Sequence, residues 1–336
     1  MPPPYDHMGP QMKTASHMFK FCQRQVAKET ISCDLCLALI VSHAAAAHVS
    51  STPETYWKSV LPNTPIPKAV SELLNIDTPP GTRVDEHHVI DTRTPQPGAR
   101  VDTTRSSSAK ILGYTSEGTS LLFLEKDMNQ GHTMNIQFTK TSSITRPSSS
   151  PFLAREVANT IPFSSKSLPD LYTRFSVKPG SIESESMKYT IGLCEEKAMK
   201  GEEKYCATSL EDMVDFTTSK VGKKVKVMST QVINANKMQK YTIDSSRKLA
   251  TTEFVNCHKR IYPYAVFYCH KVMGTRAYLV SLSGEDGSKA KALAVCHDNG
   301  GKLYPKDMVF KVLGVRPGTT PICHFLPENH IVFVPY

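Results

Sequence analysis

Hydrophobic positions are unevenly distributed along this chain. Residues 77–120 are polar and rich in Pro, Gly, Thr and Ser, and Tyr114 is their only aromatic residue. Such a composition cannot bury enough apolar surface to fold alone, so we assign residues 77–120 to a disordered linker. From residue 121 onward apolar residues become denser. The pattern therefore predicts a single carboxy-terminal folded domain over residues 121–336.

Most apolar runs in this predicted domain have the alternating or β-branched character of strands. The clearest two flank residues 283–288, where Gly and Asp predict the turn of a hairpin. Strands are predicted at residues 221–228, 264–268, 276–282, 289–295, 309–315 and 331–334. One short helix is expected over residues 210–216, because Ser209 can cap its first turn and Gly222 follows its end. The fold class is therefore mainly β with a few short helices (α+β).

The amino end has the organisation of a targeting segment. Basic residues precede a short apolar run at residues 35–41, and four alanines follow at residues 44–47. This order predicts export and cleavage, so residues 1–47 are assigned to a signal segment. A buried helix is the alternative interpretation. The charged stretch before the apolar run is long, which makes Met18 an alternative start.

A proline-broken segment follows over residues 48–76 and contains the only tryptophan of the chain, Trp57. Its composition indicates a short docking or leader element. No other stretch approaches the roughly 20 apolar residues that a membrane span requires. We therefore expect no membrane association after cleavage of the signal segment.

The chain carries a formal net charge of +9 at pH 7. Its basic residues are spread along the sequence rather than concentrated in a stripe, and no zinc-finger, Gly-rich or RNA-recognition signature accompanies them. This distribution argues against nucleic acid as a partner. In an extracellular setting the same excess would attract acidic cell-wall polysaccharide. An ordinary solvated basic surface is the alternative.

Cysteine usage points to the same compartment. Beyond the signal segment the chain has six cysteines, and an even number in an exported chain predicts three disulfides. Six cysteines allow 15 connectivities, so the sequence leaves their pairing open. The six are Cys194, Cys206, Cys257, Cys269, Cys296 and Cys323.

Four of these cysteines are followed directly by histidine, at His258, His270, His297 and His324. Gaps of 10, 25 and 25 residues separate the successive pairs. On a strand, neighbouring side chains point to opposite faces, so sulfur and imidazole would separate. The sulfurs could then form disulfides between strands and leave the imidazoles as nitrogen ligands for copper or zinc. Structural disulfides with incidental histidines are the alternative.

These pairs make the chain resemble the BURP-domain family of plant secreted proteins. The family pattern is a Cys-His pair, ten residues, a second pair, and two further gaps of about the length found here. The sequences at residues 123–128, 161–165, 201–216, 262–268 and 317–327 also resemble the family. Two departures stand out. Phe333 replaces a terminal Trp, and Leu-Tyr-Pro-Lys-Asp at residues 303–307 replaces Trp-Asn-Pro-Lys-His, which removes one imidazole.

The resemblance implies functions from two classes. The first is a non-enzymatic, wall-associated or dehydration- and stress-responsive protein of the apoplast or cell wall, similar to the dehydration-responsive and seed-protein branches. The second is a copper-dependent peptide cyclase that crosslinks a Trp or Tyr of a core peptide in cis or in trans. In that case His258, His270, His297 and His324 would hold copper, in preference to zinc. Residues 77–120 offer a core peptide only Tyr114, so we favour the non-enzymatic interpretation, and the catalytic residues of an enzyme stay unknown.

Overall fold

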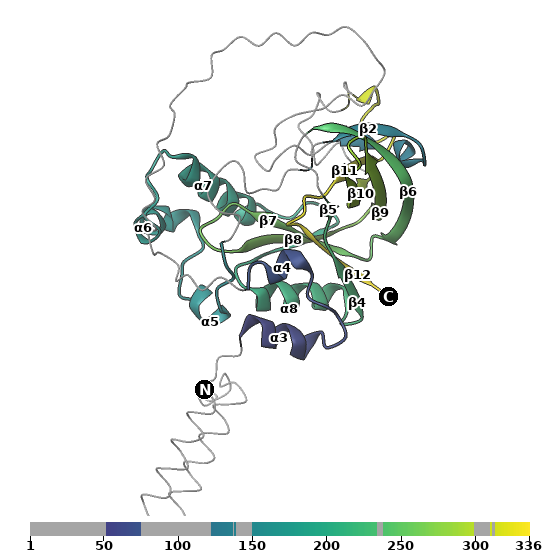
Figure 1. Cartoon of the computed structure of the whole chain (residues 1–336). Helices are drawn as coiled ribbons and strands as arrows, with labels where there is room; N and C mark the ends of the chain where they lie inside the picture. The colour runs from purple at the N-terminus through teal and green to yellow at the C-terminus, as the bar shows by residue number, and fades with distance from the viewer. Residues whose placement is uncertain are drawn as a thin grey trace, which may run out of the picture. The chain divides into compact units, whose positions relative to one another are not determined.

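The structure is a computed structural model that describes residues 52–74, 122–136, 138, 150–233, 238–298, 310 and 313–336. The predicted signal segment, the predicted linker with Tyr114, and residues 303–307 lie outside these described residues. Within them, no helix is both long and apolar enough to cross a membrane. The folded part is built on two antiparallel β-sheets, one of seven strands and one of five (Figure 1).

The seven-stranded sheet has the strand order β1-β11-β10-β9-β6-β2, with β5 paired to a further part of β10. Its longest strand, β6, shifts register twice against β9, and such irregularities bend a sheet. One cluster of buried side chains unites the edge strands with the central ones, so the sheet curls around its own core. The strands are β1 (Leu122–Leu124), β2 (Thr133–Ile136), β5 (Gln231–Ile233), β6 (Gln239–Thr251), β9 (Thr275–Gly284), β10 (Lys289–His297) and β11 (Ile322–Phe325).

The five-stranded sheet has the order β3-β8-β7-β12-β4. Its strands are β3 (Glu202–Ala207), β4 (Val225–Met228), β7 (Val255–Arg260), β8 (Val266–Val272) and β12 (Ile331–Pro335). One buried cluster joins Val332 and Val334 of this sheet to Leu293 and Val295 of the other. The two sheets therefore pack against each other through β12 and β10.

Three helices cover the side of the five-stranded sheet that faces away from the other sheet (Figure 1): α3 (Pro53–Val60), α4 (Lys68–Ser71) and α8 (Leu210–Val221). Three more, α5 (Arg155–Ala158), α6 (Leu168–Arg174) and α7 (Ile182–Glu195), contribute to a separate buried cluster around Tyr262, Tyr264 and Val266. Short 3-10 turns lie at Glu125–Met128 and Ser165–Ser167. The predicted helix is confirmed in α8. Ser209 accepts the backbone N–H of Asp212, and Gly222 ends the helix with a φ of 77°, which glycine tolerates.

Helix α3 brings Trp57 into the core of the domain. The Trp57 side chain is fully buried, its indole N–H donates to the carbonyl of Thr64, and its ring lies 6.1 Å from that of Phe333. Thr64 in turn donates to the carbonyl of Val225 on β4. Phe333 replaces the Trp of the family pattern, and the structure gives it an aromatic neighbour. The segment at residues 53–74 is thus an integral part of the fold.

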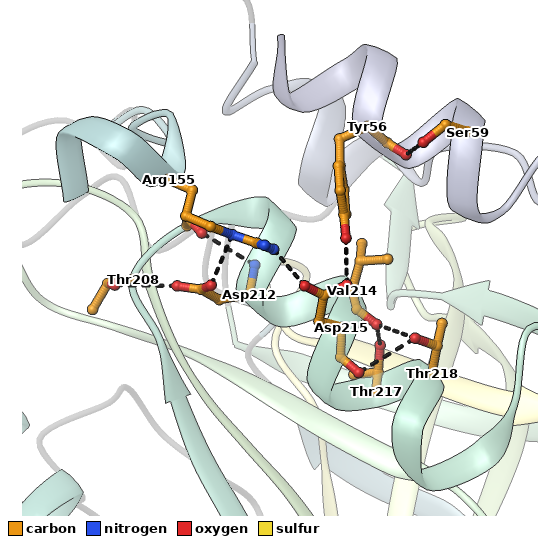
Figure 2. A network of polar contacts seen from close by, with 10 residues as sticks. Tyr56, Ser59, Arg155, Thr208, Asp212, Val214, Asp215, Thr217 and Thr218 are labelled. Carbon is orange, nitrogen blue, oxygen red and sulfur yellow. Dashed lines mark hydrogen bonds and ion pairs between the residues drawn. The ribbon is translucent and has the colours of Figure 1, made fainter. Parts of the chain in front are cut away.

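A polar network fastens the same helix to α8 (Figure 2). The Tyr56 hydroxyl donates to the carboxylate of Asp215, and Arg155 on α5 pairs with Asp215 at 2.6 Å and with Asp212 at 3.0 Å. Arg155 also lies over the ring of Tyr56. The network joins three helices, although its partly exposed ion pairs contribute little individually.

The predicted fold class is confirmed, and so is the hairpin, formed by β9 and β10 with Ser283 opposite Lys289. The strand predicted at residues 309–315 is wrong where the structure describes it. Phe310 and Leu313 have helical backbone there, and the Val315 N–H donates to the Phe310 carbonyl. The apolar residues of this segment pack on Leu122 and Ile322. Their pattern therefore reflects this buried contact and not the alternation of a strand.

Candidate metal centre

All six cysteines of the described residues form disulfides. Cys257 lies opposite Cys269 on β7 and β8, and Cys296 lies opposite Cys323 on β10 and β11, so each bridge joins two neighbouring strands. The third bridge, Cys194–Cys206, ties the end of α7 to β3. The pairing that the sequence left open is therefore local along the chain.

The Cys-His dipeptides send their two side chains to opposite faces. Cys257 and Cys269 join the buried cluster beneath the helices, and Cys296 and Cys323 join the core of the curled sheet. Because adjacent residues of a strand alternate, the histidines share the faces on which the two sheets pack. His258 has the parity of Asn256, which pairs with Val332, and His297 has the parity of Val295. Two pairs of imidazoles therefore converge between the sheets.

The first pair joins β7 and β8. His258 Nε2 lies 3.2 Å from His270 Nε2, and His258 Nδ1 lies 2.9 Å from Nδ1 of a further histidine, His330, in the loop before β12. Each contact requires one ring nitrogen to carry a proton and the other to accept it. Three imidazoles thus form a connected chain on the five-stranded sheet.

The second pair joins β10 and β11. His297 Nε2 lies 3.4 Å from His324 Nε2, and the two rings are stacked nearly parallel at 5.5 Å. His297 Nδ1 is buried without a hydrogen-bond partner among the described residues. Buried nitrogens without a partner are rare, and an unfilled ligand position is one explanation.

Burial holds His258, His297, His324 and His330 neutral. Burial lowers the pKa of His258 and of His297 well below the ordinary value, and neighbouring histidines lower both further. Burial also lowers the pKa of His324 to about 4 and that of His330 to about 3. Neutral imidazole carries the lone pair that a metal ligand needs. The pKa of His258 responds to His324 and His297 of the other sheet, so the two pairs lie close enough to interact.

The carboxylate of Glu202 is hydrogen-bonded to His270, one member of the first pair. Glu202 accepts the Nδ1–H of His270 at 2.8 Å, the hydroxyl of Tyr268 at 2.6 Å and the backbone N–H of Met199 at 2.9 Å. Burial alone would raise the pKa of Glu202, but these hydrogen bonds outweigh it and lower the pKa to about 2. Glu202 is therefore ionised at neutral pH.

Each pair of histidines is spaced to give copper or zinc two nitrogen ligands, but neither pair alone completes the coordination of such an ion. Two nitrogens bound to one ion at about 2.0–2.1 Å lie about 2.9–3.4 Å apart, and the Nε2 separations of 3.2 and 3.4 Å fall in this range. In the present side-chain positions, no group of three or more His, Cys, Asp or Glu among the described residues is placed to hold a metal ion. Completing such a group requires ring rotation. His258 and His324 are only half-buried, so the cluster is reachable from solvent.

The structure brings all four histidines of the Cys-His pairs to this cluster, and their role as metal ligands stays a prediction. Sequence reasoning missed His330, Glu202 and Tyr268. His330 is not part of a Cys-His pair. Glu202 lies on β3, a strand that the hydrophobic pattern of the sequence did not predict. Glu202 and Tyr268 lie in two segments that resemble the family, residues 201–216 and 262–268, but the resemblance gave neither residue a role.

Comparison with known protein families matches residues 121–335 to the BURP domain. This chain belongs to the BURP-domain family. It is 46% identical over 245 residues to BURP domain protein RD22 of Arabidopsis thaliana, which covers 72% of this chain and 62% of RD22. It is 37% identical over 303 residues to BURP domain-containing protein 5 of Oryza sativa subsp. japonica, covering 87% of this chain and 90% of that protein.

A third relative, BURP domain-containing protein 3 of the same rice, is 45% identical over 220 residues, 64% of this chain and 50% of that protein. The chain thus spans less than two thirds of RD22 and about half of protein 3. The BURP match begins at residue 121, whereas Trp57, outside it, is buried in the core of the same fold.

Proposed function

We propose that this BURP-domain protein is a secreted, non-enzymatic component of the plant apoplast or cell wall that responds to dehydration or stress and holds copper at its inter-sheet histidines. The observation that carries the proposal is the convergence of imidazoles in two pairs, with Nε2 atoms 3.2 and 3.4 Å apart. The residues that would hold the ion are His258 and His270 on one sheet and His297 and His324 on the other. Copper would supply a site for ligand binding or electron exchange.

Two further features support the extracellular part of the proposal. Three disulfides indicate an oxidising compartment. The net charge of +9 would draw the protein toward acidic wall polysaccharide. Exposed Lys223 and Lys224 lie together with Tyr336 around an open pocket, a local arrangement of cations and an aromatic ring that suits an acidic sugar. Similarity to RD22 favours the dehydration-responsive branch named by the resemblance.

Copper content tests the metal site. We expect purified protein, loaded with Cu(II) and then desalted, to retain copper by elemental analysis. His258→Ala and His297→Ala each remove one of the two ligands of a pair, so the copper retained at that pair should fall to background. His132→Ala is the matched control, because His132 is an exposed histidine away from both pairs and should leave the copper content unchanged. Wild-type protein that retains no copper or zinc would contradict the proposal.

One observation favours the cyclase as a second candidate. Leu122, the first residue of β1, lies directly opposite His324 on β11. Tyr114 is eight residues before Leu122, and eight residues of extended chain span at most about 29 Å. The chain therefore permits the aromatic side chain of Tyr114 to approach the histidine cluster in cis.

A mass measurement decides between the two candidates. The copper-loaded protein would be incubated in air and digested with protease, with Tyr114→Phe as the control. If the protein is a self-modifying cyclase, the peptide containing Tyr114 loses two hydrogens and the control peptide does not. We expect an unmodified mass, as the non-enzymatic proposal requires.

A further inference from the structure

We propose that Glu202 is a positioning residue for the histidine cluster: its carboxylate keeps the ring proton of His270 on Nδ1 and so turns the lone pair of His270 Nε2 toward His258. The consequence for metal affinity rests on the proposed copper site. The hydrogen-bond arrangement itself does not, since it is a property of the protein without metal.

The backbone places Glu202 next to His270. On the paired strands β3 and β8, Glu202 is opposite Val272 and Lys204 is opposite His270, so Glu202 and His270 are diagonal neighbours on one face. The Glu202 side chain is only 2% exposed. At its start β3 follows Gly201, whose φ of +82° favours glycine, and the Cys194–Cys206 bridge ties the strand to α7. The carboxylate is therefore held by a rigid support.

Three hydrogen-bond donors contact the Glu202 carboxylate, and in each of these hydrogen bonds the partner atom carries the hydrogen. The Tyr268 hydroxyl and the Met199 N–H can only donate to an ionised carboxylate, and His270 Nδ1 must carry hydrogen to do the same. A neutral His270 then has a bare Nε2, 3.2 Å from His258 Nε2. His258 Nε2 carries the proton of that contact, which leaves His258 Nδ1 to accept from His330 Nδ1.

This order of protons extends from Glu202 through three imidazoles. It gives His270 the tautomer that binds a metal through Nε2 while Nδ1–H rests on a carboxylate. In metal sites such outer partners orient the ligand, and losing them typically costs about 10–100-fold in metal affinity. Binding an ion between His258 and His270 would require the Nε2 proton of His258 to leave for solvent and the Nδ1 proton of His330 to pass to His258 Nδ1, with His330 taking a proton from solvent on Nε2.

The test uses full-length protein with the variants Glu202→Gln and Glu203→Gln. Glutamine has a single acceptor oxygen, so its NH2 group would face one of the three donors and break the arrangement. Glu203 is the matched control, because it neighbours Glu202 on the same strand, but its exposed side chain points to the opposite face and pairs with Lys220 of α8. Two measurements are made: the tautomer of the His270 ring by 15N NMR without metal, and the copper dissociation constant.

In wild type and in Glu203→Gln we expect the Nδ1–H tautomer of His270 and equal copper affinity. In Glu202→Gln we expect a changed or mixed tautomer and about 10–100-fold weaker copper binding. An Nε2–H tautomer of His270 in metal-free wild type would overturn the inference, even if Glu202→Gln failed to fold. Equal copper affinity of wild type and folded Glu202→Gln would also overturn it. Wild type with the expected tautomer but no copper binding would instead contradict the proposed function alone.

Discussion

Replacing Trp57 with alanine is expected to lower the free energy of unfolding by about 3–5 kcal/mol, the cost of truncating a buried Trp. Trp57 is fully buried, its ring packs near Phe333, and its indole N–H satisfies the carbonyl of Thr64. The substitution removes all three interactions and leaves a cavity in the cluster beneath α8. Urea unfolding followed by circular dichroism measures the change.

Lys58→Ala is the matched control for this prediction. Lys58 neighbours Trp57 on α3, but its side chain is 68% exposed and pairs with Glu54 on the surface. Its loss should change the free energy of unfolding by no more than about 0.5 kcal/mol. Equal unfolding midpoints for Trp57→Ala and Lys58→Ala would contradict the assignment of residues 53–74 to the core.

The elements that the sequence predicted are those whose local pattern and tertiary role agree. The hairpin of β9 and β10 has alternating apolar positions that face one core, with turn residues between them. Helix α8 has a Ser cap and a Gly stop that act within one turn of the backbone. Both signals depend on neighbours in sequence, so they can be detected without the fold.

The elements that were missed depend on distant neighbours. Strand β6 runs over 13 residues, yet most of its side chains are exposed, and it is held by backbone pairing with β9 and β2. Its polar sequence therefore carries little periodic signal. Trp57 looked like part of a leader because the surface that buries it is formed more than 150 residues later, by α8 and β12.

The residues of the candidate site likewise fall into those that the sequence predicted and those that it did not. Alternation along strands was enough to predict that sulfur and imidazole separate, and the cross-strand pairing of Cys257 with Cys269 and of Cys296 with Cys323 follows that geometry. Glu202 and His330 enter the cluster only through sheet order and loop placement, which no spacing rule encodes. The sequence therefore predicted the four histidines of the Cys-His pairs, and the structure was needed to find Glu202 and His330 beside them.

Removing the Cys257–Cys269 disulfide with a double alanine substitution is expected to lower the free energy of unfolding by about 3–5 kcal/mol. Its cysteines are 12 residues apart, and opening a loop of that length costs about 3 kcal/mol through the entropy of the unfolded chain. Both cysteines are also fully buried against the helices, so losing their sulfurs adds a cavity cost. Urea unfolding of the oxidised proteins measures the difference.

The Cys194–Cys206 bridge provides a control matched in loop length, because its cysteines are also 12 residues apart. Both of those cysteines are only half-buried, so their double alanine variant should lose the entropic part and little more. The difference between the two variants then isolates the contribution of core packing beneath β7 and β8. Backbone pairing still joins these strands in the Cys257/Cys269 variant, so His258 and His270 should remain adjacent and, under the proposed function, still bind copper. Equal destabilisation by both pairs would show that the buried sulfurs contribute nothing beyond loop closure, contrary to the packing seen around them.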